Sequence, residues 1–184
     1  MNRLDFADVL NERGLTGLAV EVGTHQGGYA VPFYRRWNGK LMFCVDRYIT
    51  DTGRVHTEDL GQLHEAMYKL GKPWCHVGED SWKAALSFPD EHFDFVYIDA
   101  GHDYHSVRKD IRAWWPKLKS GGIFAGHDYI DGDWVRQYTE KLSVAVLETL
   151  TYGVRSAVNE FALEHNYEVL VTDDTPTSWY WQKR

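Results

Sequence analysis

Two short apolar stretches of the chain end in carboxylate and imidazole side chains. Residues 93–102 read FDFVYIDAGH and residues 123–128 read IFAGHD. Each apolar run predicts a buried strand, and the carboxyl ends of parallel strands meet at the sheet edge where ligands bind. Carboxylates and imidazoles gathered there could hold a metal ion and move a proton near neutral pH. We therefore expect four side chains to lie close together: Asp99, His102, His127 and Asp128.

The elements that would position these side chains follow from the apolar periodicity. Strands are expected at residues 18–22, 41–45, 74–77, 93–98 and 123–125, with 168–172 and 178–182 as an antiparallel pair at one edge. Helices are expected near residues 5–13, 29–37, 57–70, 82–86, 106–118, 135–142 and 154–165. Strands alternating with helices predict an α/β fold with a Rossmann-like, doubly wound, mostly parallel sheet in a three-layer αβα arrangement. We expect residues 1–184 to form one domain of this kind.

The net charge limits the kinds of molecule that the protein is expected to bind, and the cysteines indicate the cellular compartment. With 20 Lys and Arg against 27 Asp and Glu, the formal net charge of -7 opposes binding to nucleic acid or an anionic membrane. No apolar run approaches the roughly 20 residues that span a bilayer, and no signal-peptide pattern is present. Cys44 and Cys75 lie in apolar runs without metal-binding spacing, as expected of buried thiols in a reducing compartment. We expect a cytoplasmic protein with a small-molecule partner.

The first predicted strand runs into a loop that contains an acidic residue and glycines. Glu21 at the strand tip is followed by Gly23, Thr24 and Gly27. Glycine lets the backbone approach a ligand closely. A dinucleotide fingerprint would need glycine where His25 stands, so the loop suits a nucleoside without phosphates better. A glycine turn without a ligand is the open alternative.

Two later strand ends carry polar residues that also suit a nucleoside. Asp46 ends the second strand, where its carboxylate could accept hydrogen bonds from both ribose hydroxyls, or could serve as a cap or turn residue. Asp80 and Ser81 follow the third strand and could bracket an adenine, or cap the helix that follows. The three strand ends together favour a nucleoside site beside the four side chains named above, Asp99, His102, His127 and Asp128.

Residues 98–129 (IDAGHDYHSVRKDIRAWWPKLKSGGIFAGHDY) resemble a known family. The strand, the Asp three before a His, the helix, the Gly-Gly pair and the G-H-D-Y sequence are similar to the small-molecule and sugar O-methyltransferase branch (methyltransferase domain 24-like) of the class I S-adenosylmethionine-dependent methyltransferases. The resemblance covers residues 18–129 well and residues 157–182 loosely. It implies S-adenosylmethionine as cofactor and assigns to its binding Glu21, Gly23, Thr24, Gly27, Asp46, Asp80, Ser81 and Asp99.

The resemblance extends to the metal-dependent members of that class and implies a divalent cation, Mg²⁺ or Mn²⁺. By strand position the metal ligands would be Asp99, His127 and Asp128, and His102 stands where such enzymes carry a catalytic base. A cation held there could bind two vicinal oxygens of the acceptor and lower the pKa of the hydroxyl to be methylated. His127 replaces an acid, and imidazole favours Mn²⁺, Fe²⁺, Co²⁺ or Zn²⁺ over Mg²⁺. A site without a metal, with Asp128 bonded to loop amides, stays open.

The function indicated first is therefore metal-assisted O-methylation of a small molecule or sugar, with Asp99 and His102 as the catalytic residues. Tyr129 and Trp134 would form a wall of the acceptor pocket. Larger members of the class cover the acceptor with N-terminal helices that this chain lacks, so a mobile loop or the partner subunit of a homo-oligomer would complete the pocket. Two alternatives remain: a nicotinamide-dependent oxidoreductase, and a non-catalytic nucleoside-binding module within an assembly.

Overall fold

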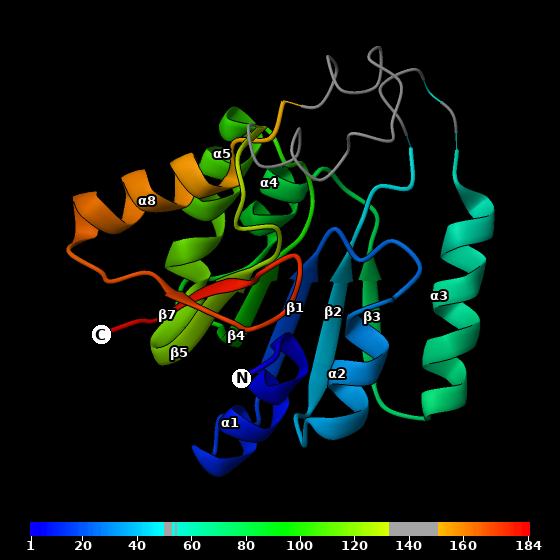
Figure 1. Ribbon diagram of the computed structural model, residues 1–184. Helices are drawn as coiled ribbons and strands as arrows, with labels where there is room; N and C mark the ends of the chain where they lie inside the picture. The colour runs from blue at the N-terminus through cyan, green and yellow to red at the C-terminus, as the bar shows by residue number, and fades with distance from the viewer. Residues whose placement is uncertain (50–52, 54, 133–150) are drawn as a thin grey trace.

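A single mixed sheet organises the computed structural model, which describes residues 1–49, 53, 55–132 and 151–184 (Figure 1). The strand order is β3-β2-β1-β4-β5-β7-β6. The strands are β1 (Leu18–Val22), β2 (Leu41–Val45), β3 (Trp74–Val77), β4 (Phe93–Ile98), β5 (Leu118–Gly126), β6 (Leu170–Val171) and β7 (Trp179–Gln182). Neighbours from β3 through β5 pair in parallel, whereas β7 pairs antiparallel with both β5 and β6. The expected mostly parallel sheet with an antiparallel C-terminal edge is confirmed.

Helices cover both faces of this sheet. One layer contains α1 (Phe6–Glu12), α2 (Ala30–Arg36) and α3 (Thr57–Leu70), and the other contains α4 (Ser81–Ala84), α5 (Tyr104–Trp114) and α8 (Val154–His165) (Figure 1). The strand order changes direction between β1 and β4. At such a switch point the loops after the two strands leave toward opposite faces, so a crevice opens between them at the carboxyl ends.

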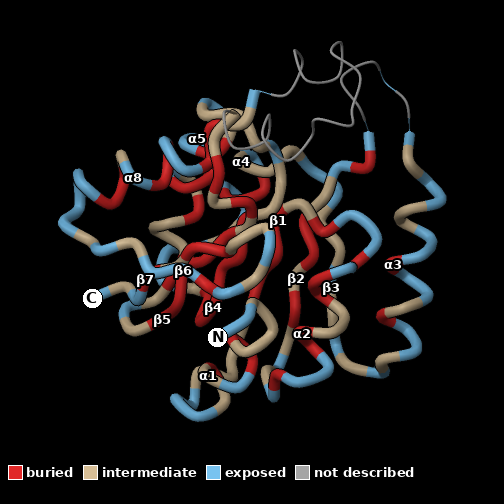
Figure 2. Tube along the Cα trace, viewed as in Figure 1, coloured by how far each residue is buried: buried red, intermediate tan, exposed pale blue. Residues whose placement is uncertain are grey.

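The core has one apolar cluster on each face of the sheet, and β4 contributes to both. Phe95 and Tyr97 join the cluster with α1, α2 and α3, whereas Val96 and Ile98 join the cluster with α4, α5 and α8. This is the period-two alternation of a strand buried on both faces. Figure 2 shows burial concentrated in the central strands, with much of α3 exposed. The site at the strand ends is thus supported by the most buried part of the chain.

The fifth strand differs from the expectation. The sequence predicts a helix to residue 118 and a strand at 123–125, but α5 ends at Trp114 and β5 begins at Leu118. Leu118 pairs with Phe93 and Ile123 with Phe95, so the extra residues form a bulge. Gly121, with φ 82°, supplies the left-handed backbone that such an irregularity requires. Residues 120–122 (Ser-Gly-Gly), which come just after the expected helix, therefore lie inside the strand.

Three other expectations have different outcomes. Both cysteines were expected to be buried, which is right for Cys44 and wrong for Cys75, whose side chain is exposed on β3. The strand expected at residues 168–172 is only the two-residue β6, since Leu170 and Val171 alone pair with β7. The helix expected at 135–142 lies outside the described residues. Among the described helices, none has the length and apolar character needed to cross a membrane.

Candidate active site

The loop after β1 brings its backbone against the end of β4. Gly23 has a φ of 92°, and a Cβ at this position would lie 2.0 Å from the carbonyl oxygen of Asp99. Only glycine fits this left-handed, close approach. The hydroxyl of Thr24 donates to the carbonyl of Glu21 at 3.2 Å and closes the turn. The ends of β1 and β4 therefore lie side by side.

The carboxylate of Asp46 joins the loop after β1 to the loop after β2. Its Oδ2 accepts from the backbone N–H of His25 and its Oδ1 accepts from that of Tyr48, both at 2.9 Å. Each carboxylate oxygen has further lone pairs, so a ligand hydroxyl can still approach. Asp46 is therefore a turn residue, as one of the two interpretations expects, and it also lines the cavity described next. Its contact with a ribose stays a prediction.

A cavity of about 530 Å³ lies at the carboxyl ends of these strands. This volume is in the range of pockets that bind small molecules. Five of the residues assigned to the cofactor by resemblance line it: Gly23, Asp46, Asp80, Ser81 and Asp99. His25, Arg47 and Trp82 line it as well, although the sequence singled out none of them as ligand contacts.

Glu21, Thr24 and Gly27 are not among the residues that line this cavity. Glu21 and Thr24 are each only 2% exposed. Burial raises the pKa of Glu21 well above its ordinary value, and the nearby charge of Asp99 adds to the shift. A Cβ on Gly27 would lie 2.7 Å from Leu63 of α3, so this glycine allows the loop to pack on that helix. In this structure the three residues have packing contacts, and their contact with a cofactor stays a prediction.

The side chains of Asp80 and Ser81 both contact other side chains of this protein. The Asp80 carboxylate lies 2.6 Å from Lys83 Nζ and 3.1 Å from Arg47 Nη1, and Lys83 chiefly holds the pKa of Asp80 below its ordinary value. The Ser81 hydroxyl donates to Asp110 of α5 at 2.6 Å. Asp80 occupies the N-cap position of α4, as the capping interpretation expects, although its side chain makes no capping hydrogen bond.

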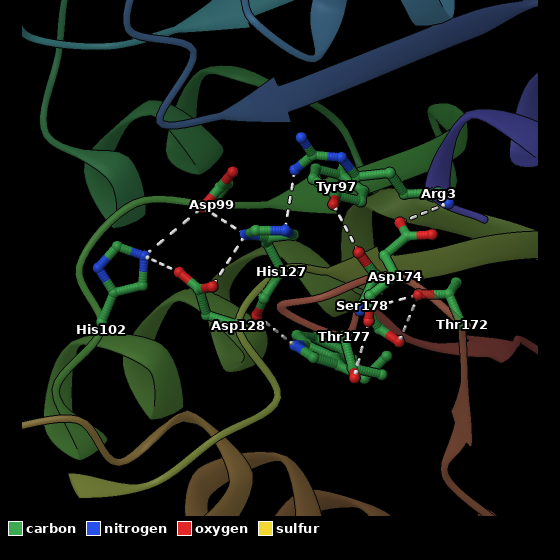
Figure 3. A network of polar contacts seen from close by, with 11 residues as sticks. Arg3, Tyr97, Asp99, His102, His127, Asp128, Thr172, Asp174, Thr177 and Ser178 are labelled. Carbon is green, nitrogen blue, oxygen red and sulfur yellow. Dashed lines mark hydrogen bonds and ion pairs between the residues drawn. The ribbon is translucent and has the colours of Figure 1, made fainter. Parts of the chain in front are cut away.

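Three of the four expected chemical residues gather at the ends of β4 and β5. One ligand atom from each of Asp99, His102 and Asp128 lies within 4.8 Å of the others. His102 Nε2 is 3.0 Å from Asp128 Oδ2 and 3.5 Å from Asp99 Oδ1 (Figure 3). Despite these distances, Nε2 is buried and has no well-aligned hydrogen-bond partner among the described residues. These three residues form an acidic cluster, and their polar atoms face a common point.

The electrostatics of this cluster favour a positive charge at that point. Burial alone would lower the pKa of His102, but the attraction of Asp128 and Asp99 outweighs it and raises the pKa to about 9. Burial would likewise raise the pKa of Asp128, yet His102 and His127 hold it well below its ordinary value. Without a cation, an imidazolium therefore lies beside two carboxylates at neutral pH. A divalent cation would meet the same attraction and would have to displace the proton on Nε2 in order to bind there.

His127 is oriented differently from the other three side chains. Its Nδ1 lies 3.1 Å from Asp128 Oδ1 and 3.9 Å from Asp99 Oδ1, and its Nε2 lies 2.8 Å from Arg3 Nη1 (Figure 3). The metal set expected from the sequence was Asp99, His127 and Asp128. The structure brings His102 to the common point and places His127 between Asp128 and Arg3.

A family model for a methyltransferase domain matches residues 20–129 of the chain. The match spans β1 to the end of β5, and so includes both the cavity and the acidic cluster. The chain belongs to this methyltransferase family. The expectation drawn from residues 98–129 is thereby confirmed at the level of the family.

Solved structures share the methyltransferase fold at low sequence identity. A protein from Staphylococcus aureus provisionally assigned as a caffeoyl-CoA O-methyltransferase has 14% identity and a TM-score of 0.70, over 96% of this chain and 80% of that one. The methyltransferase PaMTH1 from Podospora anserina, bound to S-adenosylhomocysteine, has 13% identity and a TM-score of 0.66, over 97% and 76%. The O-methyltransferase NovP has 16% identity and a TM-score of 0.63, over 98% of this chain and 79% of that one. No curated protein sequence matches the chain.

Arg3 is a further residue beside this site that sequence reasoning missed. It precedes the first helix, and its contact with His127 joins positions 124 residues apart. Nothing in the local sequence around Arg3 carries a signal for that contact. Tyr129 donates to Asn159 of α8 at 2.6 Å, and Trp134 lies outside the described residues, so the proposed acceptor wall stays a prediction.

Proposed function

We propose that this methyltransferase transfers a methyl group from S-adenosylmethionine to a hydroxyl oxygen of a small molecule or sugar, with the assistance of a divalent cation. The observation that carries the proposal is the position of Asp99, which lines the nucleoside-sized cavity and also belongs to the acidic cluster. A cofactor in the cavity and an acceptor at the cluster would therefore meet across one side chain. Alignment of the two reactants is the main contribution that such a site makes to a methyl transfer.

Different residues of the cavity would contact different parts of the cofactor. Asp46 would accept from the ribose hydroxyls, and the backbone of Gly23, which lines the cavity, would lie against the ligand. Asp80 and Ser81 would border the adenine. The absence of glycine at His25 weakens the alternative of a nicotinamide dinucleotide, whose pyrophosphate needs tight amides at the helix start.

Asp99, His102 and Asp128 fit a divalent cation by their donor chemistry. Two carboxylates and one neutral imidazole suit Mn²⁺, and the carboxylates alone suit Mg²⁺. The buried, poorly aligned Nε2 of His102 is the atom that a cation would satisfy. When bound, the cation would hold acceptor oxygens and lower the pKa of the hydroxyl.

His102 has two candidate roles that exclude each other at one atom. If Nε2 binds the cation, it cannot take the acceptor's proton. We propose the ligand role, because Nε2 faces both carboxylates, and keep the base role as the alternative. Replacement of His102 by Gln separates them: loss of Mn²⁺ affinity supports the ligand, whereas intact Mn²⁺ binding with loss of methyl transfer supports the base.

Calorimetry tests the cofactor first. S-adenosylmethionine and S-adenosylhomocysteine should both bind, and reduced nicotinamides should not; preferential binding of a nicotinamide would overturn the proposal. Transfer of a labelled methyl group to catechols and sugars, with and without a chelator, tests the reaction. Cofactor binding without turnover of any hydroxylated acceptor would instead favour the non-catalytic nucleoside-binding module.

The partners and quaternary structure are also proposals. The net charge of -7 supports a small acceptor rather than nucleic acid. A homo-oligomer, which would help to cover the acceptor, is testable by light scattering with and without cofactor.

A further inference from the structure

The contact between Arg3 and His127 fixes which nitrogen of the imidazole carries a proton. Arg3 Nη1 lies 2.8 Å from His127 Nε2. A guanidinium is always charged and has only donors, so it cannot accept a hydrogen bond from the ring. Nε2 must therefore be the acceptor, and the ring must be neutral with its proton on Nδ1.

The opposite side of the ring faces the acidic cluster. With its proton on Nδ1, His127 donates toward Asp128 Oδ1 at 3.1 Å, and Asp99 Oδ1 lies farther away at 3.9 Å. The second oxygen of Asp128, Oδ2, faces His102 at 3.0 Å. One oxygen of Asp128 is thus engaged by His127, and the other is left for the common point of the cluster.

We propose that Arg3 is a positioning residue that acts through His127: it holds His127 as a hydrogen-bond donor to Asp128 and so keeps it out of the ligand set of the cation. The inference rests on the proposed function only in its reference to the cation, because the tautomer itself follows from the contact with Arg3. A histidine that ligates a metal must offer a free nitrogen to it. Here the nitrogen nearest the carboxylates is the protonated one.

Arg3 is held in place by contacts that are independent of His127. Its backbone N–H donates to Asp174 Oδ2 at 2.7 Å, and its carbonyl accepts from the Tyr29 hydroxyl at 3.3 Å. The preceding Asn2 caps the short 3-10 helix that contains Arg3. The segment between β6 and β7 and the start of α2 therefore fix the backbone from which the guanidinium reaches the site.

His127 is also held by its backbone. Trp179 of β7 donates from its indole nitrogen to the His127 carbonyl at 3.2 Å. The preceding Gly126 lies so close to Trp179 that a Cβ would be 2.4 Å from its ring. Both partners of the contact between Arg3 and His127 are thus built into the fold.

Histidine NMR on the uniformly labelled protein without added metal tests the tautomer. We expect His127 to be neutral with the proton on Nδ1 in the wild type, and this preference to be lost in Arg3→Met. A wild-type ring protonated on Nε2, or on both nitrogens, overturns the inference. Since this measurement needs neither metal nor cofactor, it stands even if the proposed cation site is wrong.

Binding of Mn²⁺, followed by electron paramagnetic resonance, tests the consequence for the cation. Loss of a hydrogen bond that orients a ligand typically weakens metal binding by about 10- to 100-fold, so Arg3→Met should weaken Mn²⁺ binding to this extent and Arg3→Lys by less. If Mn²⁺ binds the wild type and Arg3→Met binds it equally well, the positioning role is overturned. If the wild type binds no Mn²⁺, the cation part of the proposed function fails instead.

Two further variants separate positioning from general damage to the N-terminal segment. Arg36 pairs with Asp5 and Asp8 of that segment, and Arg36→Met should loosen it while Mn²⁺ binding and the His127 tautomer stay unchanged. In His127→Asn the amide can still donate toward Asp128 but has no atom facing Arg3. Addition of Arg3→Met to His127→Asn should then cause no further loss of Mn²⁺ affinity. An equal loss in both backgrounds would mean that Arg3 acts by another route.

Discussion

Asp128 Oδ2 lies 3.0 Å from His102 Nε2, although the two residues follow different strands. Asp128 has a φ of 51°, in the left-handed region that Asn and Asp adopt more readily than other side chains. The same residue therefore supplies both the backbone turn after β5 and a carboxylate of the acidic cluster. Its replacement can separate the two roles, because Asn keeps the turn and removes the charge.

We expect Asp128→Asn to fold normally and to bind S-adenosylhomocysteine like the wild type, but to lose at least about tenfold in Mn²⁺ affinity. The physical reason is the loss of one of the negative charges directed at the common point. Calorimetry and paramagnetic resonance measure the two affinities. Asp90→Asn, at an exposed residue paired with Lys117, is the matched control. Unchanged Mn²⁺ affinity in Asp128→Asn would remove Asp128 from the ligand set.

The sequence placed Asp99 and Asp128 correctly because a strand end fixes a position to within a residue. By strand position it assigned His127 to the metal ligands and His102 to the catalytic base. The roles of the two histidines depend on side-chain orientation, which strand position does not determine. That orientation depends on Arg3, 124 residues away from His127, and no local pattern encodes such a contact. The length of β5 was missed for a related reason: Gly121 and Gly122 favour a turn locally, and pairing with β4 overrides that preference.

We expect Gly23→Ala to destabilise the protein by about 3 kcal/mol or more, since the new Cβ would meet the Asp99 carbonyl and the backbone is left-handed. Any folded fraction should bind S-adenosylhomocysteine more weakly, because the displaced backbone lines the cavity. Gly28→Ala in the same loop is the control, since its Cβ would meet nothing within 4 Å and its stability should change by about 0.5 kcal/mol or less. Urea unfolding measures both; equal stability of the two variants would contradict the close approach at Gly23.

We expect Asp46→Asn to lower the affinity for adenosine-containing ligands by about tenfold or more, since hydrogen bonds to a charged group contribute about 1.5–3 kcal/mol. Asn keeps an acceptor for one of the two backbone amides that Asp46 now accepts from, those of His25 and Tyr48. The specific readout is the preference for adenosine over 2′-deoxyadenosine in calorimetry. This preference should be present in the wild type and reduced in the variant. Equal loss for both ligands would indicate that Asp46 supports the loop and does not contact the ribose.

For the cavity, as for the acidic cluster, the sequence predicts which residues lie near strand ends and does not predict how their side chains are oriented. Asp46, Asp80 and Ser81 were placed at the cavity because each comes within a few residues of the end of a strand. Glu21 was placed there because it lies near the end of β1. Its side chain points from the strand to a face of the sheet that is covered by the fold, and it is only 2% exposed. The partner of Ser81, Asp110, had no signal at all, because an acid within a helix usually faces solvent.

Asp110 gives the protein a pH-dependent stability of predictable sign. It is 1% exposed, one oxygen accepts from Ser81 at 2.6 Å, and the other has no partner among the described residues. Burial raises its pKa to about 7 in the folded protein, with smaller opposing effects of Ser81 and Lys109. In the unfolded chain the pKa is about 3.9. Between about pH 4 and pH 7 the folded state therefore binds more protons, and this residue's contribution to stability falls as the pH rises.

We expect Asp110→Asn to remove that dependence, since Asn keeps an acceptor for Ser81 and cannot ionise. Relative to the wild type, the variant should gain stability from about pH 4 to pH 8, by up to about 4 kcal/mol, because each pKa unit is worth about 1.4 kcal/mol. Urea unfolding of both proteins across this range measures the difference, and Asp90→Asn controls for the loss of an exposed charge. A difference between wild type and Asp110→Asn that stays constant with pH would show that the native state accommodates the ionised carboxylate without penalty. Ser81 would then be held by a carboxylate rather than by a carboxylic acid.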